Sequence, residues 1–457
     1  MKENTRTTEA RENRAMLTDL YQLTMNAGYF AAGKNDTATF DLFIRKLPKD
    51  WGFYIANGLE DAVDHTTQVR FTADDLEYLR SQGLFREDYL ETLKDFRFTG
   101  DIYAVKEGTP VAANTPILRV TGPRMEAQLL ETMLLNTINF QTMVATKANR
   151  VVNAAAPAKV VDFGLRRAQE MDAAMTGARA AFVGGAVATS NVLAGKTYGI
   201  PISGTQAHSF VMSFSTELEA FRAYAEAFPN NPTLLIDTYD TLQGARNAAV
   251  VGKELEAKGK KLGAVRLDSG NLAELSQEVR GVLDNAGLQY VKIVASNDLN
   301  EYKITELKVQ GARIDGYGVG TELITAKPTA AIPGVYKLVE DEDGGKIKLA
   351  AEKKSYPGRK QVYRVLGEDG KYAHDILALE GEEVAGIPLL EKIVGAGERI
   401  VARRGLQETR AYCLEEVAKM PAHVQGVVVE KPYGFVESQG VTTLVEKLTK
   451  LKGGKKT

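Results

Sequence analysis

The sequence contains few residues of several kinds, and each shortage excludes a class of protein. Cys413 is the only cysteine among 457 residues, so the chain has no internal disulfide, which is typical of a reducing compartment. The most apolar stretch, residues 180–195, is interrupted by glycines and polar residues and falls short of the ~18 apolar residues of a membrane span. The amino terminus lacks the apolar core of a secretory signal. We therefore expect a cytoplasmic protein without a membrane partner.

Positive and negative charges are nearly balanced, and the chain has few histidines. The formal net charge is −2, which gives no indication of nucleic acid as a partner. Three of the four histidines, His65, His374 and His423, have no cysteine or histidine at metal-ligand spacing, so we assign no protein metal ligand. The fourth, His208, lies in the stretch PISGTQAHSF, just after a strand-like run and a Gly-Thr turn.

The length exceeds the ~250–300 residues of a single core, so we expect several domains. Residues 1–125 mix helical stretches with closely spaced hairpin signals and predict a small mixed α/β domain. Residues 126–330 begin with one long connecting helix after Pro123 and continue as an α/β barrel domain. Residues 331–457 alternate strand-like runs with glycine-rich turns, and predict a C-terminal region of antiparallel hairpins and helices.

A strand–helix rhythm in the middle of the chain predicts the fold class. Short apolar runs begin near Lys159, Pro201, Thr233, Gly263, Val291 and Asp315, and helical stretches separate them. Such repeats indicate parallel strands, in either an α/β barrel or a doubly wound sheet. Polar residues follow all six runs, as at the strand ends of barrel enzymes, whereas a doubly wound sheet concentrates its contacts at one crevice. We favour an irregular, TIM-like parallel barrel with a flanking N-terminal domain and a C-terminal module.

Two arginines at strand ends indicate an anionic ligand. Arg166 stands at the start of a predicted helix, where the helix dipole disfavours positive charge. Arg266 lies inside an apolar run, where an unpaired guanidinium is costly and a carboxylate or phosphate would satisfy it. Salt bridges to nearby carboxylates remain the alternative.

Carboxylates and glycines add to this pattern. Asp237 and Asp268 end two successive runs, where a carboxylate holds Mg²⁺, steadies a positive ribosyl transition state, or caps the next helix; capping suits Asp268 better. Gly318, Gly320 and Thr321 lie in GYGVGTE, which can present backbone amides to a phosphate at a late barrel strand. The glycine cluster alone is weak evidence.

His208 has two interpretations that the residues alone leave open. A lone histidine usually packs. A neutral imidazole after a strand end, three residues past Thr205, also suits an anion contact or a nucleophile for a phosphoryl group.

Six motifs together resemble the nicotinate phosphoribosyltransferase family. They are LTDLYQLTM (17–25), DFGLRRAQ (162–169), GTQAHSFVMSF (204–214), LIDTYDT (235–241), VRLDSGNL (265–272) and GYGVGTEL (316–323). They occur in the family's order, and the resemblance extends from residue 17 to at least residue 360. The resemblance implies an irregular barrel and a homodimer. It also implies a reaction in which nicotinate and 5-phosphoribosyl 1-pyrophosphate give nicotinate mononucleotide and pyrophosphate. This reaction requires Mg²⁺ and is coupled to the hydrolysis of ATP. This is the entry step of NAD salvage from nicotinate.

The resemblance also implies roles for individual residues. His208 matches the histidine that ATP phosphorylates, and Asp237 matches an essential carboxylate near the ribose and the metal. The positions that match nicotinate-holding residues are Tyr21, Thr205 and Arg266. Arg166 matches a ligand-binding arginine. Ser355, in EKKSYPGRK, matches a residue that meets phosphoribosyl pyrophosphate; the basic residues around it either screen polyphosphate or form an exposed hairpin.

Three other functions fit the sequence less well. Relatives specific for nicotinamide carry an aspartate directly after the Gly-Thr, where Gln206 stands here, and this favours the acid substrate. Quinolinate phosphoribosyltransferase shares the barrel, but it is shorter and does not use ATP. A non-catalytic relative that binds nucleotides would not need the intact set of Arg266, His208 and Asp237.

Overall fold

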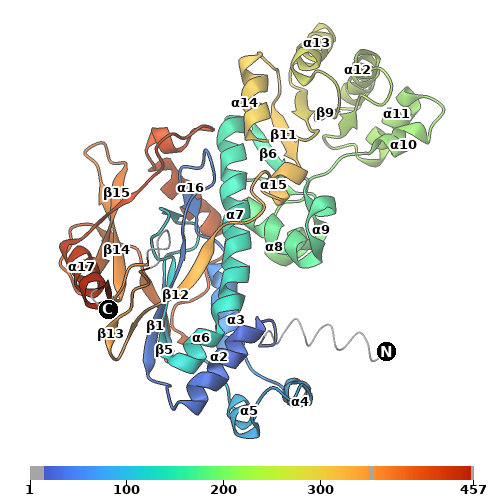
Figure 1. Ribbon diagram of the computed structural model, residues 1–457. Helices are drawn as coiled ribbons and strands as arrows, with labels where there is room; N and C mark the ends of the chain where they lie inside the picture. Colours follow the sequence, from blue (N-terminus) through green and yellow to red (C-terminus); the bar gives the residue numbers. More distant parts are fainter. Residues whose placement is uncertain (1–14, 350–354, 454–457) are drawn as a thin grey trace. The chain divides into compact units, whose positions relative to one another are not determined.

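The computed structural model describes residues 15–349 and 355–453, and the chain divides into two compact units. Unit 1 comprises residues 1–143, 331–424 and 429–457, and unit 2 comprises residues 144–330 and 425–428. The predicted connecting helix is present in two pieces, α6 (Arg124–Leu129) and the long α7 (Glu131–Ala155), and the boundary between the units falls within α7 (Figure 1).

Unit 1 contains antiparallel sheets that combine strands from distant parts of the chain. β1 (Thr37–Ile44) pairs on one side with β5 (Leu118–Pro123) and on the other with β12 (Gly334–Asp341). From its second residue onward β1 is buried. The seven-stranded sheet has the order β13-β12-β1-β5-β3-β17-β18. Its other strands are β3 (Asp101–Ala104), β13 (Gly344–Gly345), β17 (Glu391–Gly395) and β18 (Glu398–Arg399).

Two smaller sheets and a set of helices complete unit 1. A four-stranded sheet has the order β16-β14-β15-β19, and β2 pairs with β4. These strands are β2 (Tyr54–Ile55), β4 (Pro110–Val111), β14 (Lys360–Leu366), β15 (Tyr372–Leu379), β16 (Ile387–Pro388) and β19 (Phe435–Glu437). The helices are α2 (Leu20–Ala31), α3 (Leu59–Gln68), α4 (Ala73–Ser81), α5 (Glu87–Leu93), α16 (Leu406–Ala418) and α17 (Gln439–Gly453).

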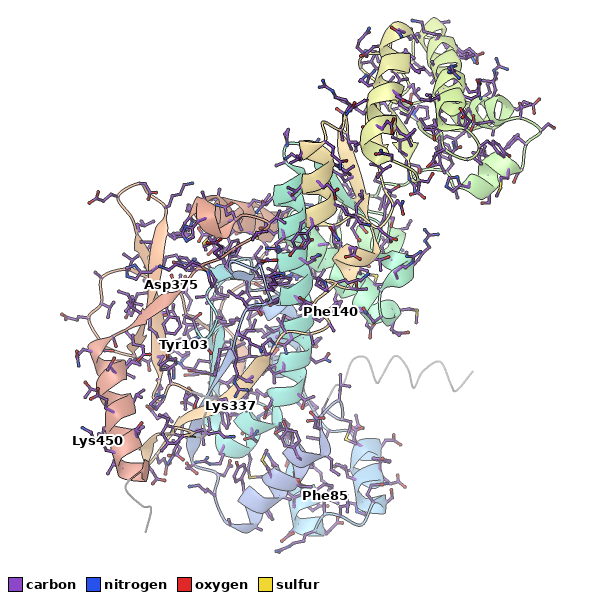
Figure 2. All side chains as sticks on the ribbon, turned by 45° about the horizontal axis from the view of Figure 1, so that its top comes forward. Phe85, Tyr103, Phe140, Lys337, Asp375 and Lys450 are labelled. Atoms are coloured by element: carbon purple, nitrogen blue, oxygen red, sulfur yellow. The ribbon has the colours of Figure 1, made fainter. Side chains whose placement is uncertain are left out.

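A buried ion pair holds the four-stranded sheet together. Arg364 on β14 is 1% exposed and donates two hydrogen bonds of 3.0 Å to the Asp375 carboxylate on β15, which Figure 2 labels. Its guanidinium carbon lies 4.6 Å from the ring centroid of Tyr372 and 5.7 Å from that of Tyr433. Because the charges neutralise each other and aromatic rings enclose the cation, the sheet accommodates this arginine in its interior.

Unit 2 contains the parallel α/β sheet that the strand–helix rhythm predicts, curled into a half-barrel. Its six strands are all parallel and have the order β7-β6-β11-β10-β9-β8. The first strand in the sequence, β6, therefore pairs with the last, β11, as happens where a barrel closes. The sheet stays open between its two edge strands, β7 and β8. The strands are β6 (Lys159–Asp162), β7 (Ala188–Thr189), β8 (Thr233–Leu235), β9 (Ala264–Leu267), β10 (Lys292–Ala295) and β11 (Gly316–Val319).

The helices between these strands begin where the sequence supplies capping side chains. Asn191, Asp240, Asn271 and Asn300 accept backbone N–H hydrogen bonds at the starts of α9, α12, α13 and α14. The helices are α8 (Glu170–Val183), α9 (Val192–Tyr198), α10 (His208–Met212), α11 (Glu217–Ala227), α12 (Thr241–Ala257), α13 (Leu272–Asn285), α14 (Glu301–Val309) and α15 (Thr321–Ile324).

One predicted strand is wrong. The run at Pro201 forms only an isolated bridge, between Thr189 and Ile202, and the edge strand is β7, which is not among the six predicted runs. Pro201 has no N–H for a ladder hydrogen bond, so the run at 201–205 does not extend the sheet. The glycines at 184 and 185 follow the end of α8 at Val183, which leaves residues 188–189 free to pair with β6.

Candidate functional site

Polar side chains follow the C-terminal ends of the parallel strands of unit 2. Asp162 ends β6, Asp237 follows β8, Asp268 follows β9 and Ser296 follows β10. Because the strands run parallel, these ends share one edge of the barrel, which is where barrel enzymes hold their substrates. Hydrogen bonds between neighbouring strand ends join several of these side chains.

The guanidinium of Arg266, on β9, is at the centre of this network. Its Nε donates to Ser296 Oγ (2.9 Å), its Nη1 to Thr205 Oγ1 (2.9 Å) and its Nη2 to Asp268 Oδ1 (2.8 Å). The guanidinium carbon lies 5.6 Å from the ring centroid of Phe163, and the side chain is 16% exposed. Two of its three partners are neutral hydroxyl groups, so an anionic ligand can replace them without leaving a buried charge unpaired.

Phe163 is a site residue that the sequence reasoning did not single out. A Cβ at position 318 would lie only 2.3 Å from a ring carbon of Phe163, so Gly318 on β11 makes room for the ring. Part of this could have been found in the sequence, because an aromatic residue directly follows a predicted strand. The adjacent strand of the sheet carries a glycine, Gly318, opposite Val161. Gly318 therefore has a packing role, and its predicted phosphate contact remains a prediction.

His208 is the first residue of α10 and is partly exposed. Its Nδ1 lies 3.2 Å from Thr238 Oγ1, a hydrogen bond in which either atom can be the donor. Its Nε2 lies 3.7 Å from Asp268 Oδ2, and the imidazole side chain is 39% exposed. The ring is therefore not a packed core residue, and the contacts connect it to the Arg266 network.

Asp268 is held in its charged form by its neighbours. Burial by itself would raise its pKa, but the hydrogen bond from the Ser296 hydroxyl and the charge and hydrogen bond of Arg266 lower the pKa below its ordinary value, and His208 adds to this effect. A carboxylate fixed in this way counters the charge of Arg266 and of any positive charge on the imidazole.

Asp237 combines an occupied and an open carboxylate oxygen. Its Oδ2 accepts hydrogen bonds of 2.7 Å from the Asp268 backbone N–H and from Ser269 Oγ. Its Oδ1 is buried and accepts no hydrogen bond from the described residues. A buried carboxylate oxygen without a partner is costly, so this atom is a candidate contact for a ligand or a cation.

Neither aspartate is the cap of the helix that follows it. Asp240 caps α12 by accepting from the Gln243 N–H (2.7 Å), and Asn271 caps α13. The capping interpretation of Asp268 is therefore wrong. Residues a few positions further along satisfy the helix starts, which leaves Asp237 and Asp268 available at the strand ends.

Gln206 directly follows Thr205 and lies two residues before His208. It is 5% exposed, and neither its Oε1 nor its Nε2 has a hydrogen-bond partner among the described residues. A buried carboxamide without partners is unusual in a folded protein. Its neighbour Thr205 accepts a hydrogen bond from Arg266, so an unsatisfied donor and acceptor lie one residue away from that network.

The two adjacent arginines after β6 differ in their contacts. Arg167 donates from Nη1 to Thr321 Oγ1 (2.9 Å), which connects the end of β6 to the start of α15. Arg166 is exposed, and within the described ranges it has neither a hydrogen bond nor an ion pair. The salt-bridge alternative for Arg166 therefore lacks support, and Thr321 lies beside a guanidinium.

Two predicted site residues, Tyr21 and Ser355, belong to unit 1. Tyr21 is an exposed residue of α2; partial burial and the charge of Glu131 raise its pKa. Ser355 is buried and directly follows residues 350–354, which lie outside the described residues and include two of the predicted basic residues. In the same motif, Lys360 is buried beside Asp41 (2.8 Å) and is not part of an exposed hairpin.

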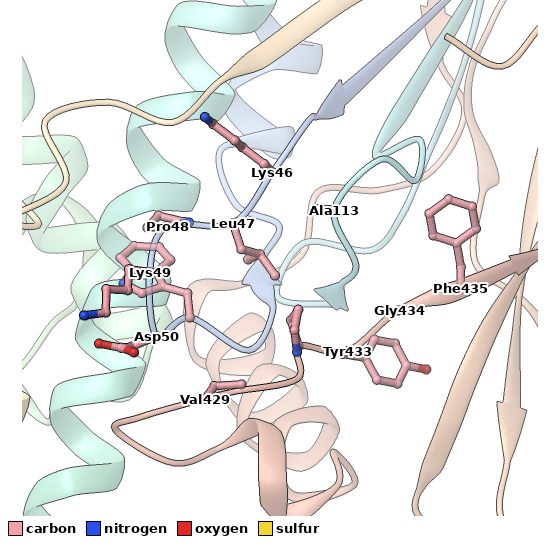
Figure 3. A pocket seen from close by; sticks show the side chains of 12 residues that line it. Lys46, Leu47, Pro48, Lys49, Asp50, Ala113, Val429, Tyr433, Gly434 and Phe435 are labelled. Carbon is pink, nitrogen blue, oxygen red and sulfur yellow. The ribbon is translucent and has the colours of Figure 1, made fainter. Parts of the chain in front are cut away.

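A separate hollow of about 660 Å³ lies on unit 1 (Figure 3). It is formed by residues 46–51 together with Ala113, Val429 and residues 432–435. None of the predicted site residues lines it, so it belongs to a different part of the molecule from the strand ends of unit 2.

The described residues lack two further features, a cluster of metal ligands and a membrane-spanning helix. In residues 15–349 and 355–453, His, Cys, Asp and Glu side chains form no group of three or more that could hold a metal ion. Within the same part of the chain, none of the helices has the length and apolar character needed to span a membrane.

Comparisons with known proteins connect this geometry to one family. Residues 16–139 match the nicotinate phosphoribosyltransferase N-terminal domain, and residues 158–335 match the nicotinate phosphoribosyltransferase family. Nicotinate phosphoribosyltransferase pncB2 of Mycobacterium tuberculosis is 44% identical over 414 residues, covering 90% of this chain and 89% of that protein.

Two further proteins agree with this match. Nicotinate phosphoribosyltransferase of Bacillus subtilis is 46% identical over 376 residues, covering 80% of this chain and 76% of that protein. The crystal structure of human nicotinic acid phosphoribosyltransferase superimposes with a TM-score of 0.84 at 30% identity, covering 94% of this chain and 99% of that one.

Proposed function

The chain belongs to the nicotinate phosphoribosyltransferase family, and from this premise we propose that it forms nicotinate mononucleotide in NAD salvage. In the reaction, the pyridine nitrogen of nicotinate forms a bond to the ribosyl carbon of 5-phosphoribosyl 1-pyrophosphate, and pyrophosphate leaves. The observation that best supports this function is the Arg266 guanidinium, which lies beside a flat aromatic ring at a strand end.

The nicotinate subsite consists of an anion contact and a flat surface. Arg266 binds the nicotinate carboxylate through the planar edge of its guanidinium, and Thr205 contributes its hydroxyl. Phe163 supplies an aromatic face for the pyridine ring. Tyr21, in unit 1, is included in the proposal because its motif matches a nicotinate-holding position of the family. The geometry of Arg266, Thr205 and Phe163 supports this assignment in unit 2.

Gln206 supports nicotinate over nicotinamide as the substrate. An aspartate at this position would accept hydrogen bonds from an amide, but it would repel the carboxylate of nicotinate. The Gln206 carboxamide is neutral and has an unpartnered N–H donor that can face an acid. Gln206→Asp therefore lowers kcat/KM for nicotinate by about 10-fold or more.

His208 is the proposed phosphoryl acceptor that couples ATP hydrolysis to synthesis. It is partly exposed, and its Nε2 lies 3.7 Å from the Asp268 carboxylate. A ring nitrogen forms a bond to the γ-phosphorus of ATP as ADP leaves, and water later breaks the nitrogen–phosphorus bond to release phosphate.

Asp237 is the proposed carboxylate near the ribose and a Mg²⁺ ion. The open Oδ1 of Asp237 fits such a cation, and Mg²⁺ is commonly bound by one or two carboxylates together with substrate phosphates and water. Mg²⁺ would neutralise the charge that develops on the leaving pyrophosphate. Asp237 itself orients the ribosyl end of the substrate through a carboxylate that Asp268 N and Ser269 hold in place.

The remaining predictions concern phosphate contacts, assembly and location. We assign the phosphate groups of the substrates to Arg166, Ser355, Gly318, Gly320 and Thr321. The exposed guanidinium of Arg166 supports this assignment. A homodimer and a cytoplasmic location are part of the same proposal, and sedimentation at several protein concentrations tests the dimer.

One incubation tests the substrates and the intermediate together. The protein is mixed with nicotinate, phosphoribosyl pyrophosphate, Mg²⁺ and ATP labelled in its γ-phosphate, and both mononucleotide and acid-labile label on the protein are followed. We expect both in the wild type, loss of the label in His208→Ala, and retention of it in His423→Ala, which removes an exposed histidine. Turnover of nicotinamide without nicotinate would overturn the substrate, and product without any labelled protein would overturn the role of His208.

A further inference from the structure

The backbone around His208 provides little restraint on its ring. α10 has only five residues, and His208 is the first of them, after Ala207 in an extended conformation. The imidazole is 39% exposed, so packing does not define its rotation. A side chain in such a place needs polar contacts to keep one orientation.

Among the described residues, Thr238 makes the contact that best meets this need. Its Oγ1 lies 3.2 Å from His208 Nδ1, within hydrogen-bond distance. The Asp268 carboxylate is 3.7 Å from Nε2, too far for a hydrogen bond, and it acts through charge. Charge attraction is weakly directional, so the hydroxyl is the group that sets the angle of the ring.

Thr238 is itself well placed to be rigid. It directly follows Asp237, whose carboxylate is fixed by two hydrogen bonds of 2.7 Å to the neighbouring strand end. Threonine is branched at Cβ and has restricted side-chain rotation. A hydroxyl group also donates or accepts, so it serves the ring in either neutral tautomer and in the charged form.

We propose that Thr238 is a positioning residue for His208, holding the imidazole in the orientation in which it accepts the phosphoryl group of ATP. This inference rests on the proposed function, in which a ring nitrogen bonds to the γ-phosphorus while the bond to ADP breaks. Transfer requires that nitrogen to lie in line with the breaking bond, and misplacement by about 1 Å costs about 100-fold in rate. Thr238 acts through His208 and does not itself bond to phosphorus.

The test compares Thr238→Val, which keeps the shape and removes the hydroxyl, with Thr238→Ser, which keeps the hydroxyl. Rapid-quench labelling with γ-labelled ATP gives the maximal rate of phosphoenzyme formation and the ATP concentration for half of that rate. We expect the maximal rate of Thr238→Val to fall about 10- to 100-fold, with the half-saturating ATP concentration changed less than about threefold. Thr238→Ser is expected to restore the rate to within about threefold of the wild type.

A matched control removes another threonine hydroxyl from the same unit. Thr176 is a partly exposed residue of α8 whose hydroxyl donates to the Asp172 carbonyl, and Thr176→Val should phosphorylate at the wild-type rate. Labelling of Thr238→Val at the wild-type rate would overturn the positioning role, and so would an equal loss in Thr238→Ser. Absence of label in the wild type would instead overturn the phosphohistidine of the proposed function.

Discussion

Two arginine–aspartate pairs, one in each unit, show how similar residues serve different purposes. In unit 1, Arg364 forms a bidentate pair with Asp375, and two tyrosine rings approach the guanidinium. In unit 2, Arg266 makes a single hydrogen bond to Asp268 and otherwise contacts hydroxyls and one aromatic ring.

The difference lies in which partners a ligand can replace. The Arg364 cation is buried with its carboxylate, so an incoming anion would have to break a desolvated ion pair. The hydroxyl partners of Arg266 are neutral, and the pair is partly open, with side chains that are 16% and 30% exposed. The first pair therefore fits a structural role, and the second fits the ligand-binding role that we propose for it.

The largest expected effect is on stability, in unit 1. Arg364→Leu leaves the Asp375 carboxylate buried without its cation, and the free energy of unfolding should fall by about 3–5 kcal/mol. Denaturant unfolding measures this change. Arg80→Leu breaks an exposed pair with Glu87 in the same unit, and it should change the free energy of unfolding far less, because solvent screens the two charges. If the two variants lost equal amounts of unfolding free energy, burial would not explain the contribution of the Arg364 pair.

The next effect is on activity, in unit 2. Arg266→Ala removes the proposed contact with the nicotinate carboxylate, and kcat/KM for nicotinate should fall by about 100-fold, because a charge-assisted bidentate contact would be lost. Steady-state kinetics provide the measurement. Arg222→Ala breaks an exposed pair with Glu254 in the same unit and should keep wild-type kinetics. An Arg266→Ala enzyme with normal nicotinate kinetics would show that the pair is structural.

A smaller effect is expected when the aromatic surface beside Arg266 is disturbed. Gly318→Ala places a methyl group 2.3 Å from a Phe163 ring carbon, so the ring must move, at a cost of about 1–3 kcal/mol in unfolding free energy. The KM for nicotinate should rise more than the KM for ATP. Gly281→Ala, in α13 where a Cβ meets open space, should instead stabilise the protein slightly. A normal KM for nicotinate in Gly318→Ala would show that Phe163 does not contact the substrate.

The smallest effect is the pH dependence of the Asp268 contribution. Its pKa is lowered in the folded protein, so its stabilising effect is present above the ordinary value of 3.8 and is lost as the pH falls through the folded pKa. The unfolding free energies of the wild type and Asp268→Asn should differ by about 1 kcal/mol at pH 7, and this difference should shrink below pH 4. A difference that stays constant from pH 7 to pH 3 would show that the charge of Asp268 is not involved.

Local signals predicted much of the fold and of the candidate site. The strand–helix rhythm predicted a parallel barrel, because its apolar runs are short and each is followed by polar residues. It failed at Pro201, where an apolar run cannot complete a ladder, and it did not single out Phe163. The importance of that ring depends on space left by Gly318 in a different strand, which no local pattern reports.

The sequence by itself determined the class of fold, the family and the residue types at the strand ends, because these follow from periodicity and from motifs in a given order. Only the tertiary structure decided which of these residues meet. Arg266 contacts Ser296, 30 residues after it, because parallel pairing of β9 with β10 brings the ends of these strands to one edge. It also contacts Thr205, 61 residues before it, which lies in a loop outside the sheet. The tertiary structure also decided that β1 and β12, far apart in the chain, share one sheet in unit 1, since strand pairing depends on register and burial rather than on distance along the sequence.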